Sequence, residues 1–352
     1  MVRAEPYSLW VERVSRWLRF DRISACFLDD ESYAPYLFVL TLVFIDVPVL
    51  STIGYLVHEG ETVHPLLDYS WWFLVPLGLV VGVIGIRRIR SEFTDAVEKV
   101  GQGDGNIRVS TPRRFRCALF VFALVLYYGI IAQNLPQLLL SEGKIIGAVK
   151  WVVLIPAGYV TIIVELFSVY VHGLLFLPLA IDRRDVPLDF SDPKKLGGME
   201  PVGSLLLTGT NFYFLGLTLW TGTTVLGPLT GIYGATNSAP GRESIAFFVV
   251  AWFTGIFLFL FSLYIVGKNT RRRKEAEISR TIREIQRCGR GPTAFTGNGF
   301  DTEKGTAECV RLYVYLDWID QTETYPVDVE KMWTMFGSIV LPVSLKLLPF
   351  VV

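Results

Sequence analysis

Residues 149–181 read VKWVVLIPAGYVTIIVELFSVYVHGLLFLPLAI, and this apolar stretch decides the fold class. After Lys150, its only acidic or basic side chains are Glu165 and His172. As an α-helix it is roughly 50 Å long, whereas the hydrocarbon core of a bilayer is about 30 Å thick. We therefore expect a single membrane-spanning helix that tilts, breaks at Pro156 or projects beyond the bilayer. Two shorter helices would give one span more, but no turn or charge separates the halves.

Other stretches along the whole chain also reach the length of about 20 mostly apolar residues that a span requires. The expected spans begin near Tyr36, Ser70, Phe115, Val149, Ser204, Ser244 and Lys331. The sequence thus predicts an all-α, polytopic membrane protein with seven transmembrane helices. Six spans lie in residues 35–267 and the seventh is 331–352, while 1–34 and 268–330 lie outside the bilayer.

The distribution of basic residues predicts the orientation of these spans, because lysine and arginine gather on the cytoplasmic side. Five lie in residues 1–34, eight in 87–116, four in 182–203 and twelve in 268–331. The four that remain for the outer side are Lys144, Lys150, Arg242 and Lys346. We expect a multi-pass protein of the cell membrane with its N-terminus in the cytoplasm and its C-terminus outside.

The composition argues against most soluble functions. The chain of 352 residues is 51% hydrophobic and 19% charged, and its 33 basic and 33 acidic residues cancel, so nothing attracts nucleic acid. Four cysteines and three histidines lack the spacing of metal ligands. No phosphate-binding loop, nucleophile elbow or zinc-hydrolase motif occurs. We expect no enzyme activity, no metal and no cofactor.

The two longer cytoplasmic segments carry amphipathic patterns. In residues 8–20, Trp17 and Leu18 alternate with arginines, as in a helix that lies on the inner leaflet. The sixth span continues inward through residues 271–287, and a second helix follows near 303–319. We expect these two helices to pair as an anchor through apolar side chains that also contact the fourth span and form most of the subunit contact. These side chains are Ile278, Ile282, Ile285, Leu312, Leu316 and Ile319.

Ionisable and polar side chains inside the spans are the candidates for function, since they are costly there. Asp46 lies mid-way along the first span beside Pro48, and it is either a hydrogen-bonded structural residue or a carboxylate that attracts a cation or ligand. We interpret Glu165 and His172, two turns apart, as a partly solvated structural pair near the inner interface. The remaining candidates for a ligand pocket, or for ordinary packing, are the aromatic residues Tyr127, Tyr128, Tyr159, Tyr213 and Trp220.

The last span carries a stripe that is polar at its cytoplasmic end and apolar toward the outside. The stripe recurs at spacings of three and four residues, so its members share one helix face. Such a face can line a pore with an apolar constriction, or it can be a packing seam between helices. Its members are Thr334, Ser338, Leu341, Leu345 and Leu348.

This organisation resembles the seven-helix ion channels of the insect odorant and gustatory receptor type. The likeness is one of architecture: an inner N-terminus, short outer loops, a projecting fourth helix, a sixth helix prolonged inward, and a cytoplasmic helix before the last span. It implies a homotetramer whose cytoplasmic helices form the anchor, whose last span lines a cation pore, and whose small-molecule ligand binds among the outer halves of the other helices. The alternatives are a secondary transporter, or a membrane sensor or scaffold acting through partner proteins.

Overall fold

The fold is a helical bundle. The computed structural model describes residues 9–50, 52–53, 56, 69–101, 113–141, 144–184, 186, 188–230, 242–287, 303–326 and 337. Throughout these residues the chain forms helices, turns and connecting segments, with no β-strand. The all-α prediction is therefore confirmed for the described part of the chain. The expected last span, residues 331–352 with its five stripe residues, lies outside the described residues apart from position 337.

The helices follow the predicted apolar stretches closely. The bounds are α1 Trp10–Trp17, α2 Phe20–Leu28, η1 Glu31–Tyr33, α3 Ala34–Phe44, η2 Ile45–Leu50, α5 Tyr69–Gly101, α6 Arg113–Ser141, α7 Lys144–Gly147, η4 Ala148–Leu154, η5 Pro156–Val160, α8 Thr161–Val171, η6 His172–Phe176, α9 Leu177–Asp182, α10 Glu200–Thr230, α11 Arg242–Arg287 and α12 Glu303–Gln321. Elements α7 to α9 form one continuous helical run, as expected for a fourth span that is not split.

Within the described residues, 4 helices are long and apolar enough to cross a membrane. They are Glu31–Leu50, Lys144–Asp182, Glu200–Trp220 and Phe248–Gln286. These four coincide with the expected first, fourth, fifth and sixth spans. Helices α5 and α6 occupy the positions of the second and third, and the number of seven spans stays a prediction.

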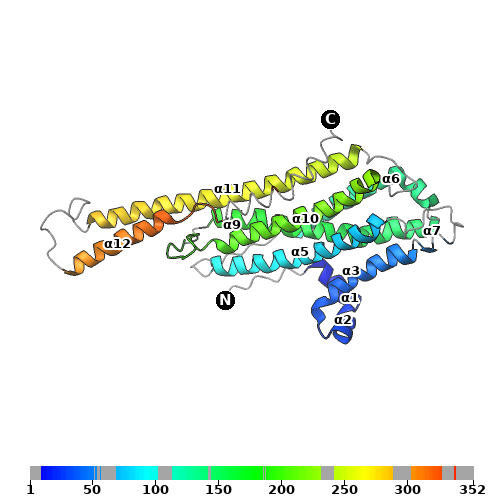
Figure 1. Cartoon of the computed structure of the whole chain (residues 1–352), viewed down its shortest axis with the longest axis horizontal. Coiled ribbons are helices and arrows are strands. Elements are labelled where there is room, and N and C mark those ends of the chain that lie inside the picture. The colour runs from blue at the N-terminus through cyan, green and yellow to red at the C-terminus, as the bar shows by residue number, and fades with distance from the viewer. Residues whose placement is uncertain are drawn as a thin grey trace.

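The bundle is elongated, and α5 packs along α10 in its most extensive described helix contact (Figure 1). Small residues on α5 permit this close approach. The Cβ that an alanine would add at Gly85 lies 2.9 Å from Cβ of Phe212 in α10, so the glycine is needed there. At Gly82 the same added atom lies 3.3 Å from Ile162 in α8. Glycines that let backbones approach are typical of helix contacts inside membranes.

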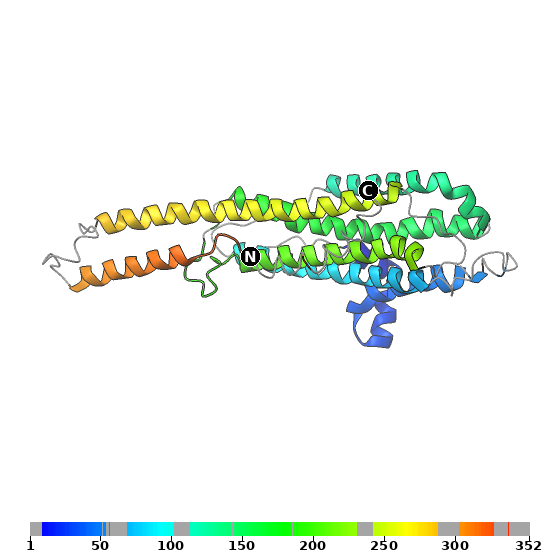
Figure 2. The ribbon, with the colours of Figure 1, turned by 45° about the horizontal axis from the view of Figure 1, so that its top comes forward.

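The α11–α12 hairpin extends beyond the other helices at one end of the bundle (Figure 2). The two helices run antiparallel, with Ile285 and Ile319 buried between them. Lys274 Nζ donates to the carbonyl oxygens of Asp320, at 2.5 Å, and Thr322, at 3.1 Å, which closes the base of the hairpin. Nearby, Asn269 of α11 donates to the Ile181 carbonyl at 3.0 Å and so holds the end of α9.

The six predicted anchor residues differ in how deeply their side chains are buried. Ile285 and Ile319 are buried, Ile278, Leu312 and Leu316 are partly buried, and Ile282 is exposed. The α12 face that looks away from α11 is apolar as well: Val310, Val314 and Trp318 are 47%, 45% and 48% exposed. The hairpin therefore packs on itself, and among the described residues it still leaves an apolar surface uncovered.

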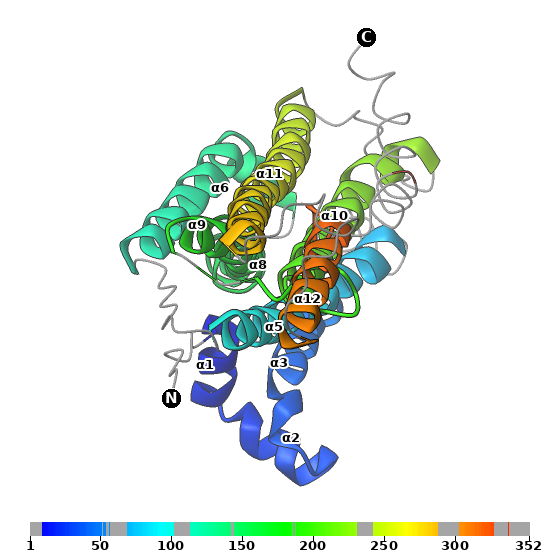
Figure 3. The same cartoon turned by 90° about the vertical axis from the view of Figure 1, so that its left-hand side faces the viewer.

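At the side of the bundle, α1 and α2 form a second small hairpin, which we call the N-terminal hairpin (residues 10–28). It projects outward beside α3 and α5, as the end-on view shows (Figure 3). The buried face of α1 consists of Val11 and Ser15, preceded by the fully buried Leu9. The N-terminal hairpin is thus attached along one face and open on the others.

Candidate functional site: a buried charge pair between two distorted helices

Asp46 meets a lysine and a tyrosine of the fourth helical run. Asp46 is 0% exposed and Lys150 is 9% exposed. Lys150 Nζ lies 3.7 Å from Asp46 Oδ1. The hydroxyl of Tyr159 donates a hydrogen bond to Asp46 Oδ2 at 2.6 Å. We call Asp46, Lys150 and Tyr159 the charge cluster. It joins the first apolar helix to the fourth.

Each residue of the charge cluster lies on a widened helical turn. Asp46 belongs to the π-helix η2, Lys150 to the π-helix η4 and Tyr159 to the π-helix η5. Prolines explain two of these distortions, because Pro48 inside η2 and Pro156 at the start of η5 lack the N–H that a regular turn uses. π-Helical turns are rare and often occur at functional sites.

The first helix also approaches the fourth closely at Gly158, one residue before Tyr159. A Cβ at this position would overlap the side chain of Leu42 in α3. The glycine therefore lets α3 lie against η5 and brings Asp46 within reach of the Tyr159 hydroxyl. A proline, a glycine and an aspartate in the sequence therefore set the geometry of the charge cluster.

The energetics indicate that the charge cluster fixes an arrangement more than it adds stability. Two unit charges about 4 Å apart attract each other by about 4 kcal/mol at an effective dielectric constant near 20. Removing both charges from water costs several kcal/mol per ion, which is of the same size. A buried charge left without its partner is much more costly, at about 3–5 kcal/mol. The structure is thus strongly biased toward states in which Asp46 and Lys150 stay together.

Two tyrosines of α6 attach to the same π-helical turns. Tyr127 donates to the Trp151 carbonyl at 2.7 Å and Tyr128 to the Val152 carbonyl at 2.9 Å. Lys150 Nζ also lies 5.5 Å from the centre of the Trp151 ring, at a distance suited to a cation–π contact. The third apolar helix is therefore bonded to the backbone immediately next to the charge cluster.

The structure separates the predicted ligand-pocket residues into two groups. Asp46 and Tyr159 are in contact, with Tyr127 and Tyr128 beside them. Tyr213 and Trp220 lie in a different aromatic cluster between α8, α10 and α11. There the Tyr213 ring stacks on Tyr170 with centres 4.4 Å apart, and its hydroxyl donates to the Ala251 carbonyl at 2.9 Å. The six residues therefore do not form one pocket.

Sequence reasoning missed Lys150, which it placed among the basic residues of the outer side. A signal was present: an aspartate inside a span needs a partner, and Lys150 is the only lysine or arginine in the stretch 149–181. The pairing itself depends on how two distant helices rotate against each other, which periodicity does not reveal.

The interpretation of Glu165 and His172 as a partly solvated pair is wrong, because both are only 6% exposed. The Glu165 carboxylate accepts the backbone N–H groups of Trp10 and of Val11, the latter at 2.9 Å. It thereby caps the positive N-terminal end of α1, as an N-cap side chain does within a single helix. His172 lies among aromatic rings, 4.5 Å from the ring centre of Phe93 and 6.0 Å from that of Phe176.

The described residues contain no group of three or more histidine, cysteine, aspartate or glutamate side chains that could hold a metal ion. The charge cluster offers a carboxylate, an ammonium group and a phenol hydroxyl, held together between the first and fourth apolar helices.

A double-mutant cycle measures whether the pair holds the helices together. We expect Asp46→Asn and Lys150→Met each to lower the unfolding temperature in detergent, because each leaves one buried charge alone. The double variant should lose less than the sum of the two single losses, with a coupling of about 1–3 kcal/mol. Tyr159→Phe serves as the matched control, since it removes one hydrogen bond and no charge. Strictly additive losses in the double variant would show that the two side chains are not coupled.

Comparisons with known proteins add no assignment for this site: the chain matches no family model, no curated protein and no solved structure. The function is therefore inferred from the arrangement of its helices and from the charge cluster.

Proposed function

We propose that this chain is a homotetrameric, ligand- or stimulus-gated cation channel of the cell membrane. It has seven spans, an inner N-terminus and a pore lined by the last span. The observation that carries the proposal is the α11–α12 hairpin, which continues far beyond the apolar part of α11 and presents an uncovered apolar face. A projecting hairpin of this kind suits an assembly of several copies around one axis.

The length of α11 supports a hairpin that lies outside the bilayer. The helix has 46 residues, so at 1.5 Å per residue it is about 69 Å long, more than twice the ~30 Å hydrocarbon core. Its last part carries Arg271, Arg272, Arg273 and Lys274 followed by further charged residues, which belong in water. Basic residues on this side agree with a cytoplasmic location.

In water, the apolar face of α12 needs a cover. Val310, Val314 and Trp318 recur every four residues and form one stripe along the outer side of the hairpin. A second copy of the same hairpin supplies an apolar surface of matching length, and closed cyclic symmetry repeats the contact around a ring. Four such copies place four last spans, one from each chain, around a common axis.

The charge cluster gives this channel a gating element. A ligand or stimulus that separates Asp46 from Lys150 changes the contact between the first and fourth helices. A gated channel requires an element with two discrete arrangements, and in this proposal the joined and the separated ion pair are those two arrangements. In this account the charge cluster lies in the membrane and the anchor in the cytoplasm, joined by the continuous helices α7 to α9 and α11.

A secondary transporter is the second candidate, and the π-helical turns favour it. Transporters bind their substrates near the membrane midplane, at helices that are broken there. The charge cluster combines such distorted turns with a carboxylate and an ammonium group. A transporter does not require the hairpin to associate, so the oligomeric state separates the two functions.

The first test is the mass of the purified protein in detergent. We expect a particle of four chains of 39.7 kDa each, after correction for bound detergent. Adding Val314→Glu and Trp318→Glu should dissociate it, because the charges lie in the apolar contact. The matched control is Arg311→Glu, another exposed position of α12. A wild-type monomer would favour the transporter, and a tetramer that survives both substitutions would place the subunit contact elsewhere.

The second test concerns conduction. With four copies around the axis, Leu341 and Leu345 form an apolar ring that excludes water, while Thr334 and Ser338 face the inner vestibule. Leu345→Ser should hydrate this ring and produce constitutive current in planar bilayers. A rotation of the helix by about 100° would bring Val340 to the axis instead. Silent bilayers for both Leu345→Ser and Val340→Ser, in folded tetramers, would contradict a pore formed by this span.

A further inference from the structure

The N-terminal hairpin exposes large apolar side chains to an unusual degree. Trp17 and Phe27 are each 80% exposed, and Leu18, Ile23 and Leu28 are exposed as well. Exposed arginines lie among them at Arg13, Arg16, Arg19 and Arg22. A mixture of bulky apolar and cationic residues on short helices is typical of elements that lie in the head-group region of a bilayer.

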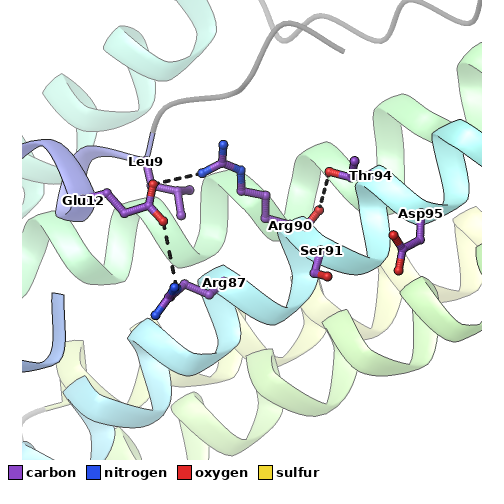
Figure 4. Close-up of a pocket in the computed structure, with 7 residues that line it drawn as sticks. All are labelled: Leu9, Glu12, Arg87, Arg90, Ser91, Thr94 and Asp95. Carbon is purple, nitrogen blue, oxygen red and sulfur yellow. Dashed lines mark hydrogen bonds and ion pairs between the residues drawn. The ribbon is translucent and has the colours of Figure 1, made fainter. Parts of the chain in front are cut away.

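The hairpin is held in a fixed position against the bundle. Glu12 of α1 pairs with two arginines of α5, at 3.1 Å from Arg90 Nη1 and 4.0 Å from Arg87 Nε (Figure 4). Arg87 also donates to the Ser32 carbonyl at 2.7 Å, just after the hairpin. Together with the bonds from Trp10 and Val11 to Glu165, these contacts connect α1 to two different bundle helices.

The same contacts leave the outer faces of the hairpin uncovered. Beside Glu12, Arg87 and Arg90 lies an open cavity of about 330 Å³, which Leu9 and Thr94 also line. The cavity is lined from both α1 and α5, while Trp17 and Phe27 are each 80% exposed and point away from the bundle core. The exposed apolar residues therefore need an environment that the described part of the chain does not supply.

We propose that the N-terminal hairpin is a membrane-surface element whose apolar side chains insert between lipid head groups and whose arginines contact lipid phosphates. Chain connectivity identifies the partner. Helix α2 ends at Leu28, and the first apolar span starts at Glu31, so the bilayer that receives this span begins within three residues of the hairpin. The bilayer is thus within reach of Phe27 and Leu28. The inference rests on the membrane assignment of the span and not on channel activity.

The turn between hairpin and span is suited to an interface. Asp30 accepts the Ser32 hydroxyl at 2.6 Å and the Ser32 backbone N–H at 2.7 Å, and these hydrogen bonds lower the pKa of its carboxyl group. The Ser24 hydroxyl donates to the Asp30 carbonyl, which holds α2 against this turn. A polar, charged turn is stable at the head groups and unstable below them, so it limits how deeply the hairpin enters.

The attachment also has a consequence for the bundle. Glu12 connects α1 to α5, and Glu165 connects it to α8. The N-terminal hairpin is therefore bonded directly to the fourth helical run, which also carries Lys150 and Tyr159.

Spin labels on the full-length protein in vesicles of phosphatidylethanolamine and phosphatidylglycerol test the proposal. The native cysteines are first replaced (Cys26→Ser, Cys117→Ser, Cys288→Ser, Cys309→Ala), and single labels are placed at Phe27→Cys and Arg22→Cys. These positions lie about 140° apart around α2, so only one should face the lipid. We expect oxygen, which concentrates in lipid, to relax the Phe27 label several-fold more than a water-soluble nickel chelate does. The Arg22 label should show the reverse.

A label at a second apolar position tests whether the result at Phe27 reflects only a local disturbance by the label. Ile23→Cys lies one turn before Phe27 on the same face and should repeat its behaviour. High access of the chelate to both the Phe27 and Ile23 labels would show that the hairpin stands in water and would overturn the proposal. Protection from both reagents, with spin–spin broadening between labelled copies, would show that a second chain covers this face and would overturn it equally. Neither outcome depends on whether the protein conducts ions.

Discussion

The ion pair between Asp46 and Lys150 is the contact on which the arrangement of the first and fourth helices depends. A carboxylate that is fully buried among apolar helices requires a partner, and only one cation lies within the long apolar stretch of the fourth run. The turns that carry the pair are widened: η2, η4 and η5 are π-helical where Asp46, Lys150 and Tyr159 lie, and prolines explain two of the three.

The same constraint explains how the N-terminus is attached. The positive end of α1 would be an unsatisfied polar group against the bundle, and the buried Glu165 carboxylate satisfies it. Glu12 then pairs with two arginines at the point where α5 leaves its apolar part. Charged side chains thus determine how α1 is attached to the bundle, whereas apolar stripes determine the contacts of the α11–α12 hairpin.

Most of the helices could be predicted from the sequence, because the length of an apolar run is a local property. The expected starts at Tyr36, Ser70 and Phe115 lie within two residues of the observed starts at Ala34, Tyr69 and Arg113. The candidate site was harder to predict from the sequence. Asp46 and Tyr159 were identified, but Lys150, the ion-pair partner of Asp46, was assigned to the outer side. Which side chains meet depends on helix rotation, on Gly158 and on the proline-linked widening of the turns, and none of these follows from periodicity alone.

Because charge is costly in hydrocarbon, we expect an odd number of spans with the basic segments inside. The direct measurement places a reporter at each end of the chain in cells: a fluorescent protein that matures only in the cytoplasm and a phosphatase that is active only outside. We expect fluorescence from the N-terminal fusion and phosphatase activity from a fusion after Val352. Both termini on the same side would require an even number of spans and would contradict the account, together with the pore that it places in the last helix.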